Sequence, residues 1–291
     1  MKHETSRLDI SGRLKRAHAR MDNLLFQSGI RNTRKLPLPD FLGIGIDKAG
    51  TTWLYEVLDK HPEVFVSHQK ELNYFDRDIA TKSLGLYSDN FKDGANKVKG
   101  EITPGYAYIP LDRIRFIHVI MPNVRLILLM RNPIEQQWSF AFHQLVHIAG
   151  ADITDESKFL DFFRKNAFYK SGGYTGIITK WLSVFPAEQL YVGFYYDIND
   201  QPKKLLCQVF NHIGVSCEVD WGSLPYNQVI VPPAGPEYEG LDQGRGVIAP
   251  RHRNSVSFMP DRYRLFLREL YHDEIRALHD RFGDKVARWV W

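Results

Sequence analysis

The chain of 291 residues has only two cysteines, Cys207 and Cys217, so it lacks both a disulfide framework and a C-x-x-C metal site. The two could pair if oxidised, but nothing in the sequence requires it. No run approaches the about 18 apolar residues that a membrane-spanning helix needs. Residues 1–20 also lack the apolar segment of a secretory signal. We therefore expect a cytoplasmic protein with no integral membrane segment and no metal.

Strong charge of either sign is absent as well. The formal net charge is only +4 at pH 7, which suits anionic ligands but gives no reason to expect nucleic acid. Apolar residues make up 44% of the chain and charged residues 25%, as in ordinary soluble globular proteins. A chain of this length can bury the core of one large domain.

The first 35 residues are polar and basic, with apolar residues at roughly helical spacing: Leu8, Leu14, Ala17, Met21, Leu24 and Leu25. We predict that residues 1–35 form an N-terminal helical extension and residues 36–291 the main domain. The extension would pack on that domain or on a neighbouring subunit, which leaves a homodimer open. Attachment to a membrane surface is the alternative.

From residue 41 onward, apolar strand patterns alternate with helical patterns. Strands are expected at residues 41–46, 64–67, 98–102, 124–130 and 190–196. Helices are expected near residues 52–59, 111–120, 134–148, 175–185, 202–214 and 261–283. Strands without polar alternation, separated by helices, predict a single-domain α/β fold with a P-loop-like central parallel sheet and helices on both faces. Residues 222–259, rich in Pro and Gly, are expected to form a long functional loop.

The segment GIGIDKAGTTWL, residues 43–54, follows a predicted strand and precedes a helix. Gly45 and Gly50 have the spacing of a Walker A loop, but its lysine would follow the last glycine, whereas Lys48 lies inside the loop. A glycine turn that opens a helix presents N–H groups and a positive dipole end to an anion. The alternative is an ordinary turn capped by Thr51 or Thr52.

A second candidate, RNPIEQQWSFAF, begins with Arg131 at the end of the predicted strand 124–130. Because ligands bind at the carboxyl ends of parallel strands, Arg131 is placed to approach the same anion as the loop. Ser139 follows on the next helix as a hydroxyl donor. A Walker B strand would end in Asp to hold Mg²⁺, so an arginine here argues against a magnesium-dependent NTPase. The alternative is an arginine paired with a surface carboxylate.

Together these segments resemble the sulfotransferases that use 3′-phosphoadenosine 5′-phosphosulfate (PAPS), closest in motifs to the carbohydrate, heparan-type enzymes and their bacterial relatives. KAGTTWL resembles the family's 5′-phosphosulfate loop and R-N-P-x(5)-S its 3′-phosphate motif. The resemblance covers most of the chain from residue 41. It implies that the 5′ end is held by Lys48, Ala49, Gly50, Thr51, Thr52 and Trp53, and the 3′-phosphate by Arg131 and Ser139.

The segment KELNYFD, residues 70–76, resembles the family's E-x-x-[FY]-F element, in which the Glu is the catalytic base. Glu71 is the matching residue, and a carboxylate can take the proton that a hydroxyl acceptor loses. The alternative is a surface Glu in a Lys-Glu pair. His68 is the rival base, because the small-molecule branch of the family uses a histidine.

Two further segments resemble family elements less closely. GEITPGY, residues 100–106, resembles an element near donor and acceptor, but Ile102 stands where the animal enzymes often have lysine. A late basic loop with Arg245, Arg251 and Arg253 would close on the 3′-phosphate, with a solvated charge cluster as the alternative. Six aromatic side chains are candidates to line an acceptor cleft: Tyr74, Phe75, Tyr106, Trp138, Phe140 and Phe142. We expect at least about half of them to be core residues instead.

The resemblance implies a PAPS-dependent O-sulfotransferase that releases adenosine 3′,5′-bisphosphate (PAP) and needs no metal. Its acceptor would be a hydroxyl of a carbohydrate, a lipid or a secondary metabolite. A P-loop nucleotide kinase and a non-catalytic nucleotide-binding protein are the alternatives.

Overall fold

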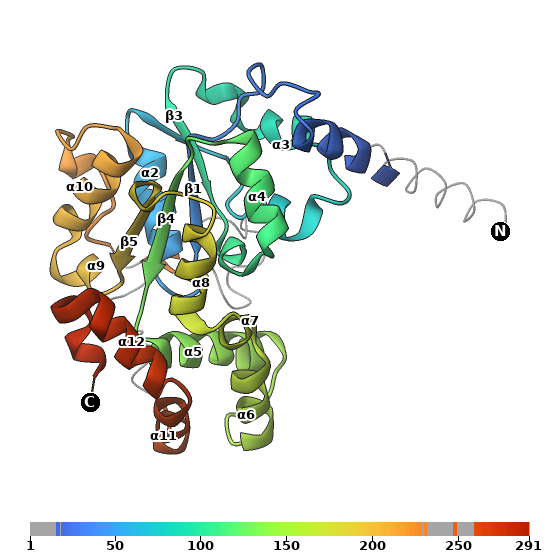
Figure 1. Cartoon of the computed structure of the whole chain (residues 1–291). Helices are drawn as coiled ribbons and strands as arrows, with labels where there is room; N and C mark the ends of the chain where they lie inside the picture. Colours follow the sequence, from blue (N-terminus) through green and yellow to red (C-terminus); the bar gives the residue numbers. More distant parts are fainter. Residues whose placement is uncertain (1–15, 18, 229, 232–246, 249–258, 291) are drawn as a thin grey trace.

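The computed structural model (Figure 1) describes residues 16–17, 19–228, 230–231, 247–248 and 259–290. Its centre is a five-stranded sheet in the order β2-β3-β1-β4-β5, with every neighbouring pair parallel. The strands are β1 (Phe41–Gly45), β2 (Val64–Val66), β3 (Val98–Ile102), β4 (Arg125–Met130) and β5 (Leu190–Phe194). A two-stranded antiparallel pair, β6 (Ile230–Val231) and β7 (Val247–Ile248), lies apart from this sheet. The predicted α/β fold with a parallel sheet is confirmed.

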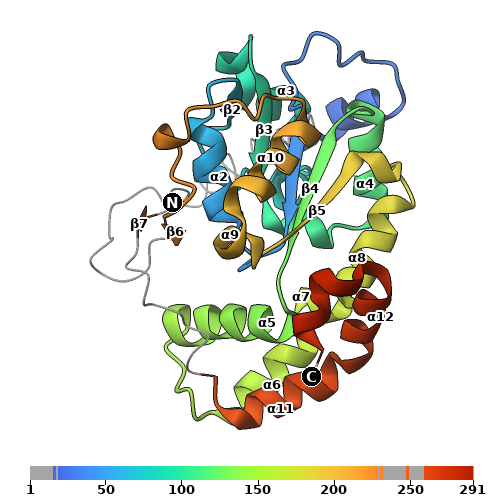
Figure 2. The same ribbon diagram turned by 90° about the vertical axis from the view of Figure 1, so that its left-hand side faces the viewer.

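Helices cover both faces of the sheet, as expected. In Figures 1 and 2, α2 (Thr51–Lys60) and α10 (Pro202–Ile213) lie on one face, and α4 (Leu111–Ile120) and α8 (Gly173–Leu182) on the other. Shorter helices lie between these elements in the sequence: α3 (Leu84–Ser88), α9 (Asp197–Asp200), η1 (Tyr74–Asp78), η2 (Asp89–Gly94), η3 (Pro104–Tyr108), η5 (Ala187–Gln189) and η6 (Trp221–Ser223).

A second group of helices lies beyond the carboxyl ends of the strands (Figure 2). It contains α5 (Pro133–Ala141), η4 (Phe142–Ile148), α6 (Glu156–Lys165), α7 (Ala167–Lys170), α11 (Asp261–Leu270), α12 (His272–Phe282) and η9 (Gly283–Trp289). Trp138 on α5 is fully buried and stacks on Phe159 of α6 and Tyr263 of α11. This aromatic packing holds α5 in place below the sheet.

Strand β1 is buried along its whole length and β4 along all but its first residue, which explains their unbroken apolar sequences. In β4, every residue from Leu126 to Met130 is at most 1% exposed. A strand covered on both faces has no solvent side on which polar residues could alternate. This burial makes the central strands the most predictable elements of the chain.

Two predicted helices differ in the structure. The helix expected over residues 261–283 is divided at Tyr271 into α11 and α12. The helix expected over residues 134–148 begins at Pro133 and changes at Phe142 from α-helical to the wider π-helical winding of η4. Neither change is visible in the apolar periodicity, which continues through both positions.

Cys207 on α10 and Cys217 form a disulfide, with Cα atoms 5.1 Å apart. The sequence allowed this pairing without requiring it, and the structure contains it. Ten residues separate them in sequence, and the end of α10 at Ile213 turns the chain back toward Cys207. No helix in the described part of the chain is long and apolar enough to cross a membrane.

The N-terminal region is helical at residues 19–27 and packs on the main domain. Ala19 and Phe26 are buried. The buried Asn23 donates from Nδ2 to the Ile79 and Lys82 carbonyls at 2.7 and 3.4 Å. Its Oδ1 accepts from the Tyr74 hydroxyl at 3.0 Å and the Leu84 amide at 3.2 Å. One polar side chain therefore ties this helix to the body.

Candidate active site

The loop between β1 and α2 contains the first candidate residues. Lys48 and Gly50 have positive φ values of 61° and 90°, and Gly50 immediately precedes α2. The positive φ of Gly50 favours glycine, and a Cβ atom there would lie only 2.3 Å from Cδ1 of Ile198, whose side chain would have to move. Thr51 and Thr52 form the buried first turn of α2, where backbone N–H groups have no partner within the helix. The loop therefore has the geometry of an anion site.

The two charged loop residues have shifted pKa values. Burial lowers the pKa of Lys48 from 10.5 to about 8, against the opposing effect of Asp47 and Glu71. Burial also raises the pKa of Asp47 to about 6, and the charge of Glu71 adds to this rise. Lys48 is thus a desolvated cation at neutral pH, and it acts more strongly on a nearby anion than a solvated lysine would. Asp47 was not among the residues singled out from the sequence.

Arg131, the first residue after β4, reaches this loop. Its Nη1 donates to the Lys48 carbonyl at 3.2 Å, and its Nε donates to Glu135 Oε2 at 3.2 Å. The guanidinium carbon lies 4.3 Å above the centre of the Tyr195 ring. The residue is only 6% exposed. Arg131 is therefore a buried cation that is paired with the Glu135 carboxylate and also contacts the loop.

Helix α5 turns one face toward the same loop. Gln136 is fully buried and donates from Nε2 to the Asp47 carbonyl at 2.8 Å. Ser139 and His143 follow three and seven residues later, so they share this face of the helix. Burial lowers the pKa of His143 to about 4, and the charge of Lys48 contributes. His143 is therefore a neutral imidazole near Lys48, and neither it nor Gln136 carries a sequence signal that we recognised.

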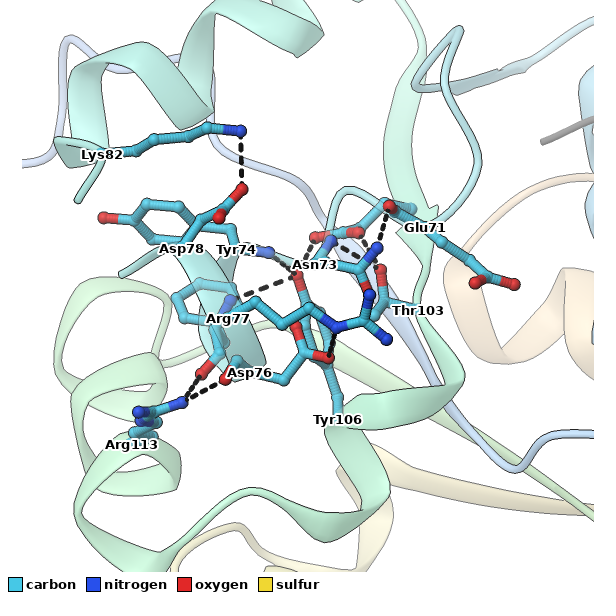
Figure 3. A network of polar contacts seen from close by, with 12 residues as sticks. Glu71, Asn73, Tyr74, Asp76, Arg77, Asp78, Lys82, Thr103, Tyr106 and Arg113 are labelled. Carbon is cyan, nitrogen blue, oxygen red and sulfur yellow. Dashed lines mark hydrogen bonds and ion pairs between the residues drawn. The ribbon is translucent and has the colours of Figure 1, made fainter. Parts of the chain in front are cut away.

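Glu71 approaches the loop from the segment after β2. Its charge affects the pKa values of both Asp47 and Lys48. Its backbone has a positive φ of 63°, and its N–H donates to the Ile102 carbonyl at 3.2 Å. Asn73 Nδ2 donates to the Glu71 carbonyl at 2.6 Å. In Figure 3 the Glu71 carboxylate points away from the polar network around η1.

His68 lies in a different environment from Glu71. Its side chain is 71% exposed, and Nε2 lies 3.5 Å from Oδ2 of the equally exposed Asp93. The ring packs edge-on against Phe65. The structure therefore presents His68 as a surface side chain and Glu71 as a neighbour of the loop.

The segment GEITPGY supports the turn that carries Glu71. Glu101 is fully buried and accepts from Tyr87, Thr103 and Tyr106 at 2.6, 2.7 and 2.9 Å. Burial raises its pKa to about 6. The same Thr103 and Tyr106 hydroxyls accept from the Asn73 and Tyr74 amides at 3.4 and 3.1 Å (Figure 3). The element thus fixes the backbone that follows Glu71.

Four of the six aromatic residues considered for an acceptor cleft are core residues. Tyr74, Phe75, Tyr106 and Trp138 are each at most 1% exposed, whereas Phe140 and Phe142 are partly exposed.

The remaining donor-loop candidates are also buried. Ala49 is fully buried, and Trp53 is 2% exposed with its Nε1 donating to the Tyr226 carbonyl at 3.1 Å. Trp53 therefore joins α2 to the segment after η6. Arg245, Arg251 and Arg253 lie outside the described residues.

A parallel sheet with a glycine loop opening α2 and an arginine directly after β4 defines an α/β protein of the P-loop-like class. The chain belongs to the sulfotransferase family: the family model described as "Sulfotransferase domain" matches residues 38–223. This match confirms the resemblance found in the sequence.

Relatives with assigned names carry the same domain in longer chains. The membrane-associated sulfotransferase kil1 of Dictyostelium discoideum is 25% identical, over 67% of this chain and 60% of that protein. Human bifunctional heparan sulfate N-deacetylase/N-sulfotransferase 1 is 22% identical, over 87% of this chain and 31% of that protein. The chain thus spans less than two thirds of each relative.

Solved structures share the fold. A sulfotransferase from Alicyclobacillus acidocaldarius has a TM-score of 0.61 and 17% identity, covering 87% of this chain and 98% of its own. The sulfotransferase domain of the Synechococcus PCC 7002 olefin synthase has a TM-score of 0.52 and 13% identity, covering 82% and 96%.

Proposed function

We propose that this protein transfers a sulfuryl group from PAPS to a hydroxyl acceptor and releases PAP. The observation that carries the proposal is the contact between Arg131 Nη1 and the Lys48 carbonyl, 3.2 Å long. It joins the two segments that resemble the 5′-phosphosulfate and 3′-phosphate motifs of the family. The partly buried cation of Lys48 and the N-terminus of α2 fit the anionic end of such a donor.

In the proposed reaction, Glu71 accepts the proton of the acceptor hydroxyl. The acceptor oxygen forms a bond to sulfur as the bond between sulfur and the bridging phosphate oxygen breaks. PAP leaves with that electron pair. Lys48 and the first-turn residues Thr51 and Thr52 stabilise the charge that develops on the bridging oxygen and the sulfuryl group. Arg131 and Ser139 hold the 3′-phosphate, and Arg251 and Arg253 are proposed to close over it.

The acceptor is proposed to be a carbohydrate, a lipid or a secondary-metabolite hydroxyl. The heparan-type relative supports a carbohydrate, and its name also raises N-sulfation as a second possibility. A screen of hydroxyl and amine acceptors with PAPS, followed by mass spectrometry, tests both. We expect a mass gain of one sulfonate on a hydroxyl compound. Transfer to amines alone would overturn O-sulfation, and no transfer to any acceptor would contradict the proposal.

A nucleotide kinase is the main competing function. The residue after β4 is Arg131, where a magnesium-binding Asp would stand. Magnesium-dependent ATP turnover would favour the kinase.

A cytoplasmic location and a homodimer remain proposals. The Cys207–Cys217 disulfide counts against the cytoplasm, because disulfides are rare in reducing compartments. Cell fractionation and analytical ultracentrifugation test the two proposals separately.

A further inference from the structure

Lys70 is a buried lysine beside the proposed base. Its side chain is only 4% exposed, whereas that of Glu71 is 42% exposed. The Lys70 ammonium forms an ion pair and hydrogen bond with Oε1 of Glu71. Lysine is rarely buried unless its charge is paired, and the proposed reaction above gives this residue no role.

The pair depends on the local backbone. In an extended chain, neighbouring side chains point to opposite sides, so residues 70 and 71 would normally not meet. Glu71 instead adopts a positive φ of 63°, which carries an energetic cost for a residue other than glycine. Hydrogen bonds from the Glu71 amide to the Ile102 carbonyl and from Asn73 Nδ2 to the Glu71 carbonyl hold this conformation. The turn therefore brings the two side chains together.

Other charges in the site limit what Lys70 can do. Asp47 and Lys48 of the loop lie near enough to Lys70 for its charge to affect their pKa values. Arg131, directly after β4, lowers the pKa of Lys48, and Lys48 in turn lowers the pKa of His143 in η4. Two cations, Lys48 and Lys70, thus share the vicinity of two carboxylates, Asp47 and Glu71. Only Lys70 among them has a direct contact with Glu71 that fixes one carboxylate oxygen.

We propose that Lys70 is a positioning residue for Glu71 rather than a donor ligand. It holds Oε1, so that Oε2 is directed toward the acceptor hydroxyl. The inference rests on the proposed sulfotransferase function and assigns a role that acts through Glu71. A charged partner in a fixed place also prevents Glu71 from rotating toward Lys48, which leaves the Lys48 cation for the donor.

The test compares kinetics of Lys70→Met, Lys70→Arg, Glu71→Gln and the Lys70→Met/Glu71→Gln double variant, using PAPS and an acceptor found for the wild type. We expect Lys70→Met to lower kcat by about tenfold to a hundredfold. The KM for PAPS and the Kd for PAP should change less than about twofold, because a group that acts only through the base leaves donor binding intact. Lys70→Arg, which keeps the charge, should recover part of the lost rate.

The double variant separates a role through Glu71 from an independent one. If Lys70 acts through Glu71, Lys70→Met has almost no further effect once Glu71 is Gln. The inference would be overturned if the loss of kcat in the double variant equalled the product of the losses in the two single variants. A Kd for PAP that rises more than about fivefold in Lys70→Met would also overturn it. The thermal melt of Lys70→Met would reveal a folding defect. In that case the kcat of Lys70→Arg is the test, because a folded Lys70→Arg protein with a kcat no higher than that of Lys70→Met would also refute the role. A wild-type protein without any transfer would refute the proposed function itself.

Discussion

Lys48 carries its charge on a partly buried side chain, and burial lowers its pKa. Its lowered pKa of about 8 means that the cation is fully present below pH 7 and is lost as the pH rises through 8. An anionic donor favours the charged form, so binding should weaken with this loss. The residue therefore makes donor binding sensitive to pH in a range that is easy to measure.

We predict that the affinity for PAP falls by about tenfold between pH 7 and pH 9. Isothermal titration calorimetry across this range measures the change. Lys48→Arg is the matched control, because a guanidinium stays protonated and should give a flat profile. A wild-type profile as flat as that of the variant would contradict the role of Lys48.

Glu71 and His68 differ in their surroundings, and this difference decides between them as the base. Glu71→Gln keeps the shape of the side chain but cannot accept a proton, so we expect kcat to fall by about a hundredfold or more. His68→Ala removes an exposed ring and should change kcat less than about twofold. Steady-state kinetics on both variants give the comparison. The opposite pattern would move the base to His68.

At the scale of elements, burial explains which helices and strands can be predicted correctly from the sequence. Strand β3 has its predicted bounds of 98–102, and α4 its predicted bounds of 111–120, because apolar periodicity reports directly on which side chains are covered. Asp47 and Gln136 were not recognised because their contacts join distant segments of the chain. Gln136, for example, reaches the Asp47 carbonyl across 89 residues of sequence. No local pattern encodes such a contact. Lys70 was considered only as part of a surface Lys-Glu pair, because the motif itself does not show that this lysine is buried.

The loop at the start of α2 should tolerate no side chain at Gly50. Gly50→Ala combines a positive φ of 90° with a Cβ 2.3 Å from Ile198. We expect it to lower the free energy of unfolding by about 2–4 kcal/mol and to weaken PAP binding, since the first-turn amides must move. Urea unfolding and calorimetry measure the two effects.

Gly29 provides the matched control for this prediction. It has a positive φ of 73° but no atom within 4 Å of its Cβ position. Gly29→Ala should therefore lose only about 1–2 kcal/mol and leave PAP affinity unchanged. Equal effects of the two substitutions on PAP binding would show that the close approach of α9 to the loop is unimportant.

At the scale of the whole molecule, the helix at residues 19–27 is joined to the body by Asn23. Its amide makes four hydrogen bonds to the region of η1 and α3. This region follows the turn that carries Glu71 in the sequence. The predicted division between residues 1–35 and 36–291 is therefore bridged by buried contacts.

We predict that Asn23→Ala lowers the free energy of unfolding by about 2–3 kcal/mol, because it leaves buried polar partners unpaired. Gln27→Ala, an exposed substitution on the same helix, should change it by less than about 0.5 kcal/mol. Urea unfolding monitored by tryptophan fluorescence compares them. Equal midpoints for Asn23→Ala and the wild type would show that the helix is not part of the cooperative unit.

The central claim is that the loop around Lys48 binds the sulfuryl donor for transfer. The most direct measurement is the rate at which radiolabelled sulfonate passes from PAPS to an acceptor, in the wild type and in Lys48→Ala. Removing the Lys48 cation should lower the rate by about a hundredfold or more, while the thermal melt stays close to that of the wild type. A Lys48→Ala protein that transfers label at nearly the wild-type rate would contradict the account.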